Sequence, residues 1–270
     1  MDNDDVLIGR LLSRREAVRL LGIGGAAAFG GWKLHAAGMQ APPVLASCVV
    51  RPEMTEGPYF VDGSIARSDV RTNTTTGAAR EGVALGLAFT VSQLAAGRCT
   101  PLPGAIVHVW QCDAVGVYSG VSDPGVGSGN LTDNSLRGIQ TADARGRAAF
   151  TTVYPGWYRG RAVHIHFKIR TTAAGAAYEY TSQLFFPESL NDEIHALPPY
   201  ASHGRRDTLN QRDGIYRAGG DQLLLQPVKT AAGYDATLDI VLDLADANVG
   251  RSDAEGRGRG RGRRGGGPGL

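Results

Sequence analysis

The sequence lacks the long apolar stretches that define helical bundles and membrane spans. After residue 50, no segment keeps the 3.6-residue apolar repeat of an amphipathic helix, apart from a short one at residues 189–196. The Gly- and Ala-rich run at residues 22–31 is too short to cross a bilayer. We therefore expect neither a helical bundle nor a stable membrane span.

A basic surplus is also missing from most of the chain. The formal net charge of the 270 residues is +2, but the basic residues gather at the two ends. Residues 49–250 contain slightly more Asp and Glu than Lys and Arg. Because a surface that binds phosphate groups normally carries excess positive charge, we expect no nucleic-acid partner for this central region.

The central region instead contains short segments of alternating or continuous apolar character, separated by Gly, Asp and Asn turns. We predict strands at residues 84–94, 105–110, 148–153, 162–170, 178–186, 222–226 and 237–244. A chain with 42% hydrophobic and 20% charged residues has the composition of an ordinary folded domain. The pattern predicts one all-β domain over residues 48–250, built as a two-sheet β-sandwich with short helices and long loops.

The two ends of the chain differ from this domain. Adjacent Arg14 and Arg15, followed by the Gly/Ala-rich run, resemble a twin-arginine export signal over residues 1–37, although an ordinary amphipathic helix is the alternative. Residues 251–270 are Gly and Arg with little else, and such a segment cannot bury enough apolar surface to fold. We expect an exported protein (periplasmic, secreted or cell-surface) with a disordered tail that is either simply solvated or binds polyanions.

The three cysteines allow two interpretations of Cys48. It follows Leu45-Ala-Ser, which resembles a lipoprotein box and would make it a lipid anchor. A disulfide with Cys99 fits an oxidising compartment better and leaves Cys112 as a buried thiol. The spacing also allows Cys112 to be the partner of Cys99, so the pairing stays open at this point.

Residues 154–169 contain the most informative pattern for chemistry. Side chains alternate along a strand, so His164 and His166 project from one face while Ile165 and Phe167 face the core. Such a pair is a weak metal signal by itself, and two solvated imidazoles are the alternative. No Asp or Glu flanks the pair, which disfavours zinc or manganese. Tyr158 lies just upstream, and two tyrosinates with two neutral imidazoles suit a hard trivalent ion such as Fe(III).

A second tyrosine, Tyr118, lies within residues 104–119, which read as an alternating strand that runs into a Gly-containing turn. Four motifs then occur in order: this segment, Tyr154-Pro-Gly-Trp-Tyr158, Arg161-Ala-Val-His-Ile-His166 and Thr181-Ser-Gln-Leu-Phe185. Together they resemble the intradiol ring-cleavage dioxygenases of the protocatechuate dioxygenase type, and especially the exported branch of that family. The resemblance covers roughly residues 48–244.

The resemblance implies one Fe(III) per chain, held by Tyr118, Tyr158, His164 and His166. A catechol and O2 are the implied substrates, and a cis,cis-muconate the product. By position, Tyr158 would also take a proton from the catechol, Arg161 would stabilise negative charge that develops on the ring, and Gln183 would orient the anhydride by hydrogen bonding. The oligomeric state stays open.

Two other classes compete with this interpretation. An exported non-catalytic β-sandwich module could use the Arg/Gly tail for attachment. A metal-dependent hydrolase would need a general-base carboxylate near the metal, and none flanks the histidines.

The sequence also departs from the family pattern. Only residues 159–163 separate Tyr158 from His164, where the protocatechuate enzymes carry a longer insertion, which predicts a shallower site that accepts bulkier catechols. Residues 119–138 are expected to cover the site as a lid or rim. Tyr59 either lines the pocket or packs at the edge of the sandwich.

Overall fold

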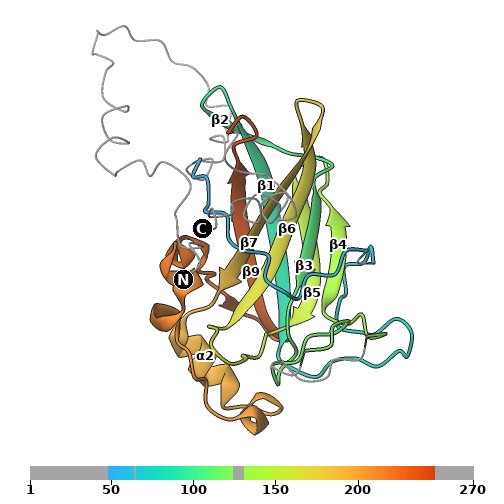
Figure 1. Ribbon diagram of the computed structural model, residues 1–270, viewed down its shortest axis with the longest axis vertical. Coiled ribbons are helices and arrows are strands. Elements are labelled where there is room, and N and C mark those ends of the chain that lie inside the picture. The colour runs from blue at the N-terminus through green and yellow to red at the C-terminus, as the bar shows by residue number, and fades with distance from the viewer. Residues whose placement is uncertain (1–47, 64, 124–130, 247–270) are drawn as a thin grey trace, which may run out of the picture.

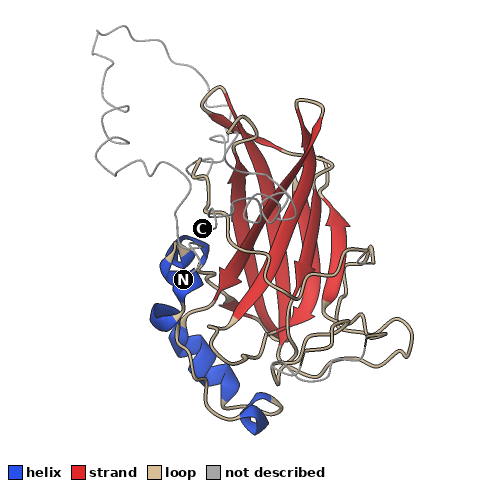
Figure 2. Ribbon diagram, viewed as in Figure 1, coloured by secondary structure: helices blue, strands red, loops and turns tan. Residues whose placement is uncertain are grey.

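The computed structural model describes residues 48–63, 65–123 and 131–246. The predicted export signal and the Arg/Gly tail lie outside the described residues, so both stay predictions. Within the described part, strands predominate and the few helices are short, as Figure 2 shows. No helix in this part is long and apolar enough to cross a membrane.

The strands form two sheets, which confirms the predicted β-sandwich (Figures 1 and 2). Sheet A has five strands: β1 (Ala84–Ala95), β2 (Arg98–Pro101), β5 (Arg147–Val153), β8 (Val228–Lys229) and β9 (Gly233–Leu242). Sheet B has four strands in the order β4 (Arg137–Thr141), β3 (Ile106–Trp110), β6 (His164–Ala173) and β7 (Ala176–Phe185). All pairs are antiparallel except β1 with β9.

Apolar side chains from the two sheets meet in a single core. Buried and half-buried residues alternate along most of β1, as expected for a strand with one face inward. Phe89 on β1 lies 5.3 Å from Phe167 on β6, measured between ring centroids, and thus joins the two sheets. Ile165 and Phe167 are both fully buried, which confirms their predicted inward orientation.

Six of the seven predicted strands are present, and the short helix predicted at residues 189–196 is α2 (Glu188–His195). The strand predicted at residues 222–226 is wrong. That segment forms the end of a 3-10 turn, η3 (Gly220–Leu223), and then makes only an isolated bridge from Leu224 to Phe185. Leu223 and Leu225 are buried while Leu224 is half-buried, so the alternation is real. The ladder does not continue because Phe185 is the last residue of β7.

Two connecting segments protect the edges of the sandwich. The Arg67 amide donates to Ile139 on β4 at 3.1 Å, and the Val70 amide donates to Thr151 on β5 at 3.0 Å. This stretch therefore pairs first with the edge of one sheet and then with the edge of the other. Upstream, the Met54 amide donates to Thr181 on β7 at 2.8 Å. Pairing of this kind leaves fewer free edge groups for aggregation.

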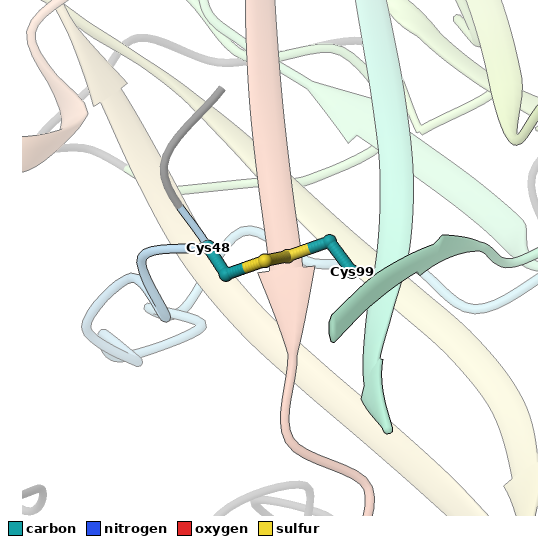
Figure 3. The surroundings of a disulfide bond; sticks show 2 residues. All are labelled: Cys48 and Cys99. Atoms are coloured by element: carbon teal, nitrogen blue, oxygen red, sulfur yellow. A yellow bond between two sulfur atoms is a disulfide. The ribbon is translucent and has the colours of Figure 1, made fainter. Parts of the chain in front are cut away.

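A disulfide joins Cys48, at the start of the described chain, to Cys99 on β2 (Figure 3). Its sulfur atoms are 2.04 Å apart. Cys112 is the buried free thiol. Of the alternatives that the sequence left open, the structure therefore contains the Cys48–Cys99 pair.

Candidate metal centre

A row of cross-strand neighbours in sheet B brings together one side chain from each of its four strands. Trp110 on β3 is paired with Arg137 on β4 and with His166 on β6, and His166 is paired with Gln183 on β7. Residues that are directly opposite in an antiparallel sheet point to the same face. This face is the one turned away from the core, because Phe167, the next residue on β6, is in the core.

The two histidines are buried, with exposed fractions of 2% for His164 and 1% for His166. The alternative of two solvated imidazoles is therefore wrong. Nδ1 of His164 donates to the carbonyl of Ala162 at 2.6 Å, which leaves the lone pair on its Nε2. That atom lies 3.0 Å from Nε2 of His166, whose ring stacks on Trp110 with 4.9 Å between centroids.

Burial keeps both imidazoles neutral. It lowers the pKa of His164 to about 3, with the charge of Arg161 adding to the effect. It also lowers the pKa of His166 well below its usual value. Since metals bind the neutral form of histidine, both side chains are in the binding form at neutral pH.

The two predicted tyrosines lie beside these histidines. The Tyr158 ring is 5.5 Å from that of His164, and the Tyr118 ring is 6.3 Å from that of His166. The tyrosine rings are 5.6 Å apart. The Oη atom of Tyr158 lies 3.4 Å from Nε2 of His164, while the buried Oη of Tyr118 has no hydrogen-bond partner among the described residues. All four predicted ligands are thus brought together.

Two glycines allow the loops that carry these tyrosines to pack closely against each other. A Cβ on Gly156 would lie 2.4 Å from the carbonyl oxygen of Asp113, and a Cβ on Gly116 would lie 2.2 Å from the carbonyl oxygen of the residue before Tyr158. Gly116 also has a positive φ of 83°, which side chains disfavour. The two backbones therefore pack directly against each other, and this contact fixes Tyr118 relative to Tyr158.

The side chain of Asp113 organises the Tyr118 loop from within. It accepts hydrogen bonds from the amides of Val115 and Val117, at 3.0 and 2.9 Å. It also forms an ion pair with Arg80 at 3.2 Å. Sequence reasoning did not identify this role. An Asp followed by a Gly-containing turn is a local signal for it, but the contact with Arg80 is not local.

Arg161 and Gln183 are in contact beside Tyr158. Nη2 of Arg161 donates to Oε1 of Gln183 at 2.5 Å, and its Nη1 lies 3.4 Å from Oη of Tyr158. The Gln183 amide nitrogen donates to the carbonyl of Thr55 at 3.0 Å. The guanidinium is therefore fixed next to the candidate metal ligands.

Asp213 is a further site residue that sequence reasoning missed. It accepts from Nε of Arg161 at 2.9 Å and from the Ala162 amide at 2.8 Å, and it caps α3 (Gly214–Arg217) through the Ile215 amide. Burial opposes its ionisation, but the charge of Arg161 and these hydrogen bonds outweigh that effect and keep the pKa of Asp213 below its usual value. The helix cap is readable from sequence, but the partnership with Arg161 is not.

Tyr59 packs against both candidate tyrosine ligands. Its ring stacks on Tyr118 with 4.6 Å between centroids and meets the edge of Tyr158 at 5.7 Å. Its hydroxyl donates to Asp123 at 3.0 Å. Tyr59 therefore lies against the candidate ligands, and its role in lining the pocket stays a prediction.

The segment that carries Tyr59, which we term the cover segment (residues 56–62), is held at both ends by ion pairs to β6. Glu56 pairs with the buried Lys168, and Asp62 pairs with Arg170 at 2.8 Å. Between them, the ring of Phe60 lies 4.4 Å from Nζ of Lys168. Outward-facing residues of β6 beyond the histidines thus anchor the cover segment.

The predicted lid at residues 119–138 needs a correction to its end. Arg137 and Gly138 belong to β4, so the connection ends at Leu136. Asp123 contacts Tyr59, which puts the start of the connection beside the site. Residues 124–130 lie outside the described residues, so a covering role for them stays a prediction.

The fold and the side chains together define a β-sandwich with a buried set of two imidazoles and two phenols. Among the residues that the structure describes, no three His, Cys, Asp or Glu side chains form a separate metal-binding group. The model of the family described as "Dioxygenase" matches residues 55–243, which is most of the chain. The chain therefore belongs to this dioxygenase family.

Solved structures agree with this assignment. An intradiol ring-cleavage dioxygenase from Tetranychus urticae has a TM-score of 0.63 and 29% identity, over 76% of this chain and 100% of that one. The dioxygenase domain of a dioxygenase carbohydrate-binding protein fusion from Streptomyces sp. SirexAA-E has a TM-score of 0.52 and 29% identity, over 72% and 99%. The resemblance to intradiol ring-cleavage dioxygenases is thus confirmed.

More distant structures share the fold alone. Catechol 1,2-dioxygenase from Acinetobacter sp. ADP1 has a TM-score of 0.50 and 20% identity, over 74% of this chain and 65% of that one. No curated protein matches the sequence.

Proposed function

We propose that this protein is an exported intradiol dioxygenase with one Fe(III) per chain. It opens a catechol-type ring between the two hydroxyl-bearing carbons with O2 and gives a cis,cis-muconate-type product. The observation that carries the proposal is the buried convergence of Tyr118, Tyr158, His164 and His166 in a chain of the dioxygenase family.

The donor set fits a ferric ion on chemical grounds. Burial raises the pKa of Tyr158 to about 12 and that of Tyr118 well above its usual value, so neither phenol ionises unaided. A bound cation reverses this preference and takes both as phenolates. Two phenolate oxygens and two imidazole nitrogens form a hard, anionic set that suits Fe(III). When bound, the ferric ion would draw electron density from a chelated catecholate and make its ring susceptible to O2.

Tyr158 supplies a base as well as a ligand. Its Oη lies near both His164 and the guanidinium of Arg161, at 3.4 Å from each. An oxygen in that position can accept a proton from a catechol hydroxyl while the adjacent cation favours the anionic substrate.

Arg161 supplies a fixed positive charge for the substrate ring. Asp213 holds one edge of its guanidinium and Gln183 holds another, so the group needs little rearrangement when charge develops. Both ends of the Gln183 amide are bonded within the protein, to Arg161 and to Thr55. We therefore assign Gln183 primarily to the positioning of Arg161; its amide nitrogen has a second N–H for the proposed hydrogen bond to the anhydride.

The substrate class follows from the short connection between Tyr158 and His164. Residues 159–163 leave less material to wall the site than the longer insertion of the protocatechuate enzymes, so we propose that bulky catechols are accepted. The test compares kcat/KM for catechol, protocatechuate and catechols with a long side chain para to one hydroxyl. Rejection of the long substrates by more than about a hundredfold, or ~2.7 kcal/mol, contradicts this part of the proposal.

The central test is a visible spectrum of the purified protein together with metal analysis and a ring-opening assay. We expect a reddish protein from a tyrosinate-to-Fe(III) charge-transfer band, about one iron per chain, and incorporation of both atoms of labelled O2 into the product. A colourless, zinc-loaded protein with full activity would contradict the proposal.

The export part of the proposal is tested separately. Adjacent Arg14 and Arg15 are its basis. Replacing both with Lys should retain the full-length precursor inside the cell, as measured by fractionation, whereas unchanged export contradicts the twin-arginine assignment. A matched replacement of Arg145 and Arg147 by Lys should leave export unchanged.

A further inference from the structure

Arg137 is a buried arginine whose hydrogen-bond acceptors are all uncharged. Its exposed fraction is 3%. Nη1 donates to the carbonyl of Tyr59 at 2.7 Å, and Nη2 and Nε donate to the carbonyl of Ser119 at 2.6 and 3.0 Å. Nε also lies 3.2 Å from Oγ of Ser119. None of the ion pairs formed by the described residues includes Arg137.

A buried cation of this kind is costly unless an anion lies nearby. The nearest group with a role in the proposed site is Tyr118, because the Cζ atom of Arg137 lies 5.9 Å from the centroid of its ring. In the proposed iron-bound state this ring carries an anionic oxygen. Arg137 forms no ion pair among the described residues, although the charge of Asp133 also acts on it, and its guanidinium faces the ligand that becomes negative.

The hydrogen bonds of Arg137 also connect the parts that hold Tyr118 in place. Ser119 directly follows Tyr118, and Tyr59 stacks on the Tyr118 ring at 4.6 Å. Arg137 itself is fixed in β4, in the same cross-strand row as Trp110 and His166. One guanidinium thus ties the Tyr118 loop and the cover segment to the strand frame that carries His166.

We propose that Arg137 is a positioning residue for the metal-bound form of Tyr118: it fixes the loop and the cover segment to sheet B, and its charge offsets that of the phenolate. This inference rests on the proposed function. Arginine suits the task because its planar group donates several hydrogen bonds in fixed directions while keeping its charge.

The proposed role of Arg137 predicts different effects on the metal-bound state and the metal-free state. A purely structural arginine stabilises both states equally. An arginine that offsets the charge of bound Tyr118 stabilises the iron-loaded state more, so its loss must weaken iron binding and change the electronic spectrum. Without the nearby cation, the phenolate electrons lie higher in energy, and the charge-transfer band moves to lower energy.

The experiment compares Arg137→Met and Arg137→Lys with a matched control, Arg206→Met. The side chain of Arg206 is also only 5% exposed, it pairs with Asp192 at 2.6 Å, and its hydrogen bonds do not involve the Tyr118 loop or the cover segment. Three quantities are measured: ferric iron affinity by chelator competition, the visible band, and the unfolding temperature with and without iron.

We expect Arg137→Met to bind iron about 30-fold more weakly, which is ~2 kcal/mol at 1.4 kcal/mol per factor of ten, and to show the shifted band. Arg137→Lys keeps the charge and should retain the band, with a loss of affinity below about fivefold. Arg206→Met should lower the unfolding temperature equally with and without iron, and leave the band and the affinity unchanged.

Iron affinity within about threefold of wild type and an unshifted band in Arg137→Met would overturn the inference, as would equal shifts in Arg206→Met. If Arg137→Met does not fold, Arg137→Lys decides: retention of the band and affinity supports the inference, and loss of both overturns it. A wild-type protein that binds no ferric iron instead contradicts the proposed function, so the two failures are distinguishable.

Discussion

The faces of the two sheets that point away from the shared core are built very differently. On β1 of sheet A, this face carries small residues such as Gly86, Ala88 and Thr90, and all three are half-exposed. On β6 of sheet B, the equivalent face carries His164, His166 and Lys168, with exposed fractions of only 2%, 1% and 2%.

This contrast indicates which sheet carries function. Burial of ionisable groups disfavours folding unless partners compensate. Ionisable residues at these positions therefore do not make the protein more stable than apolar residues would. The cover segment and the tyrosine loops nevertheless bury this face of sheet B, and the cover segment gives Lys168 and Arg170 carboxylate partners. In the proposed function, sheet A serves as the scaffold and sheet B carries the candidate metal centre.

The largest expected effect comes from removing a candidate ligand on β6. His166→Gln should lower kcat/KM by about 1,000-fold or more, ~4 kcal/mol, because an imidazole donor is lost from the metal. Thr90→Val on the outward face of β1 is the matched control and should stay near wild type. Steady-state ring cleavage and iron content measure both. A His166→Gln protein with normal iron content and activity would contradict the assignment of the metal centre to sheet B.

The next effect concerns buried and exposed ion pairs. Lys168→Met removes the buried cation that pairs with Glu56 and Glu179 and should lower the free energy of unfolding by about 3 kcal/mol. Lys229 on β8 pairs with Glu193 at the surface, with exposed fractions of 72% and 54%, so Lys229→Met should change little. Urea unfolding of the two variants provides the measurement. Equal losses would show that the Lys168–Glu56 ion pair contributes no more to stability than a surface ion pair does.

A smaller effect is expected from pH, and it also belongs to sheet B. Burial lowers the pKa of His108 on β3 to about 4, from an ordinary value near 6.5, with the charge of Arg170 adding to the shift. Between these two values the unfolded chain binds the proton and the folded chain does not, so stability falls as the pH drops from about 6.5 to 4. His108→Gln should remove about 2 kcal/mol of that fall, measured by urea unfolding across the range. An unchanged pH slope contradicts the assignment.

Tyr158→Phe should have a moderate effect on catalysis and little on folding. The ring packing is retained, but the oxygen that accepts the catechol proton is lost, so substrate chelation should slow by about tenfold, ~1.4 kcal/mol. Stopped-flow binding of catechol to the iron-loaded protein measures this step. Binding kinetics that match the wild type would count against the assigned base.

The smallest effect is expected from the C-terminal tail. Truncation after residue 250 removes a segment whose composition cannot form a core, so kcat/KM should stay within a few-fold. Loss of folding or iron on truncation would show that the tail belongs to the structural part of the protein.

Much of the fold followed from local patterns, and the exceptions have a physical reason. The alternation along β1 and β6 is a property of consecutive residues, so it was readable from sequence. Residues 222–226 alternate in the same way, yet Leu224 makes only an isolated bridge with Phe185. A strand exists only where another edge accepts its hydrogen bonds, and no local pattern reports whether that edge is free.

The sequence by itself determined the set of candidate ligands. His164 and His166 share a face because side chains alternate along any strand, and Tyr118 and Tyr158 were found through motifs that are contiguous in the chain. These are local properties, so they do not depend on how distant segments pack.

Only the tertiary structure decided what surrounds those ligands. Asp213 reaches Arg161, Glu56 reaches Lys168, and Arg137 enters the same row as His166 through the register of β4, β3 and β6. The register of strand pairing and the course of a loop depend on the packing of the entire core. A shift of one residue in the pairing of β4 would send Arg137 to the opposite face.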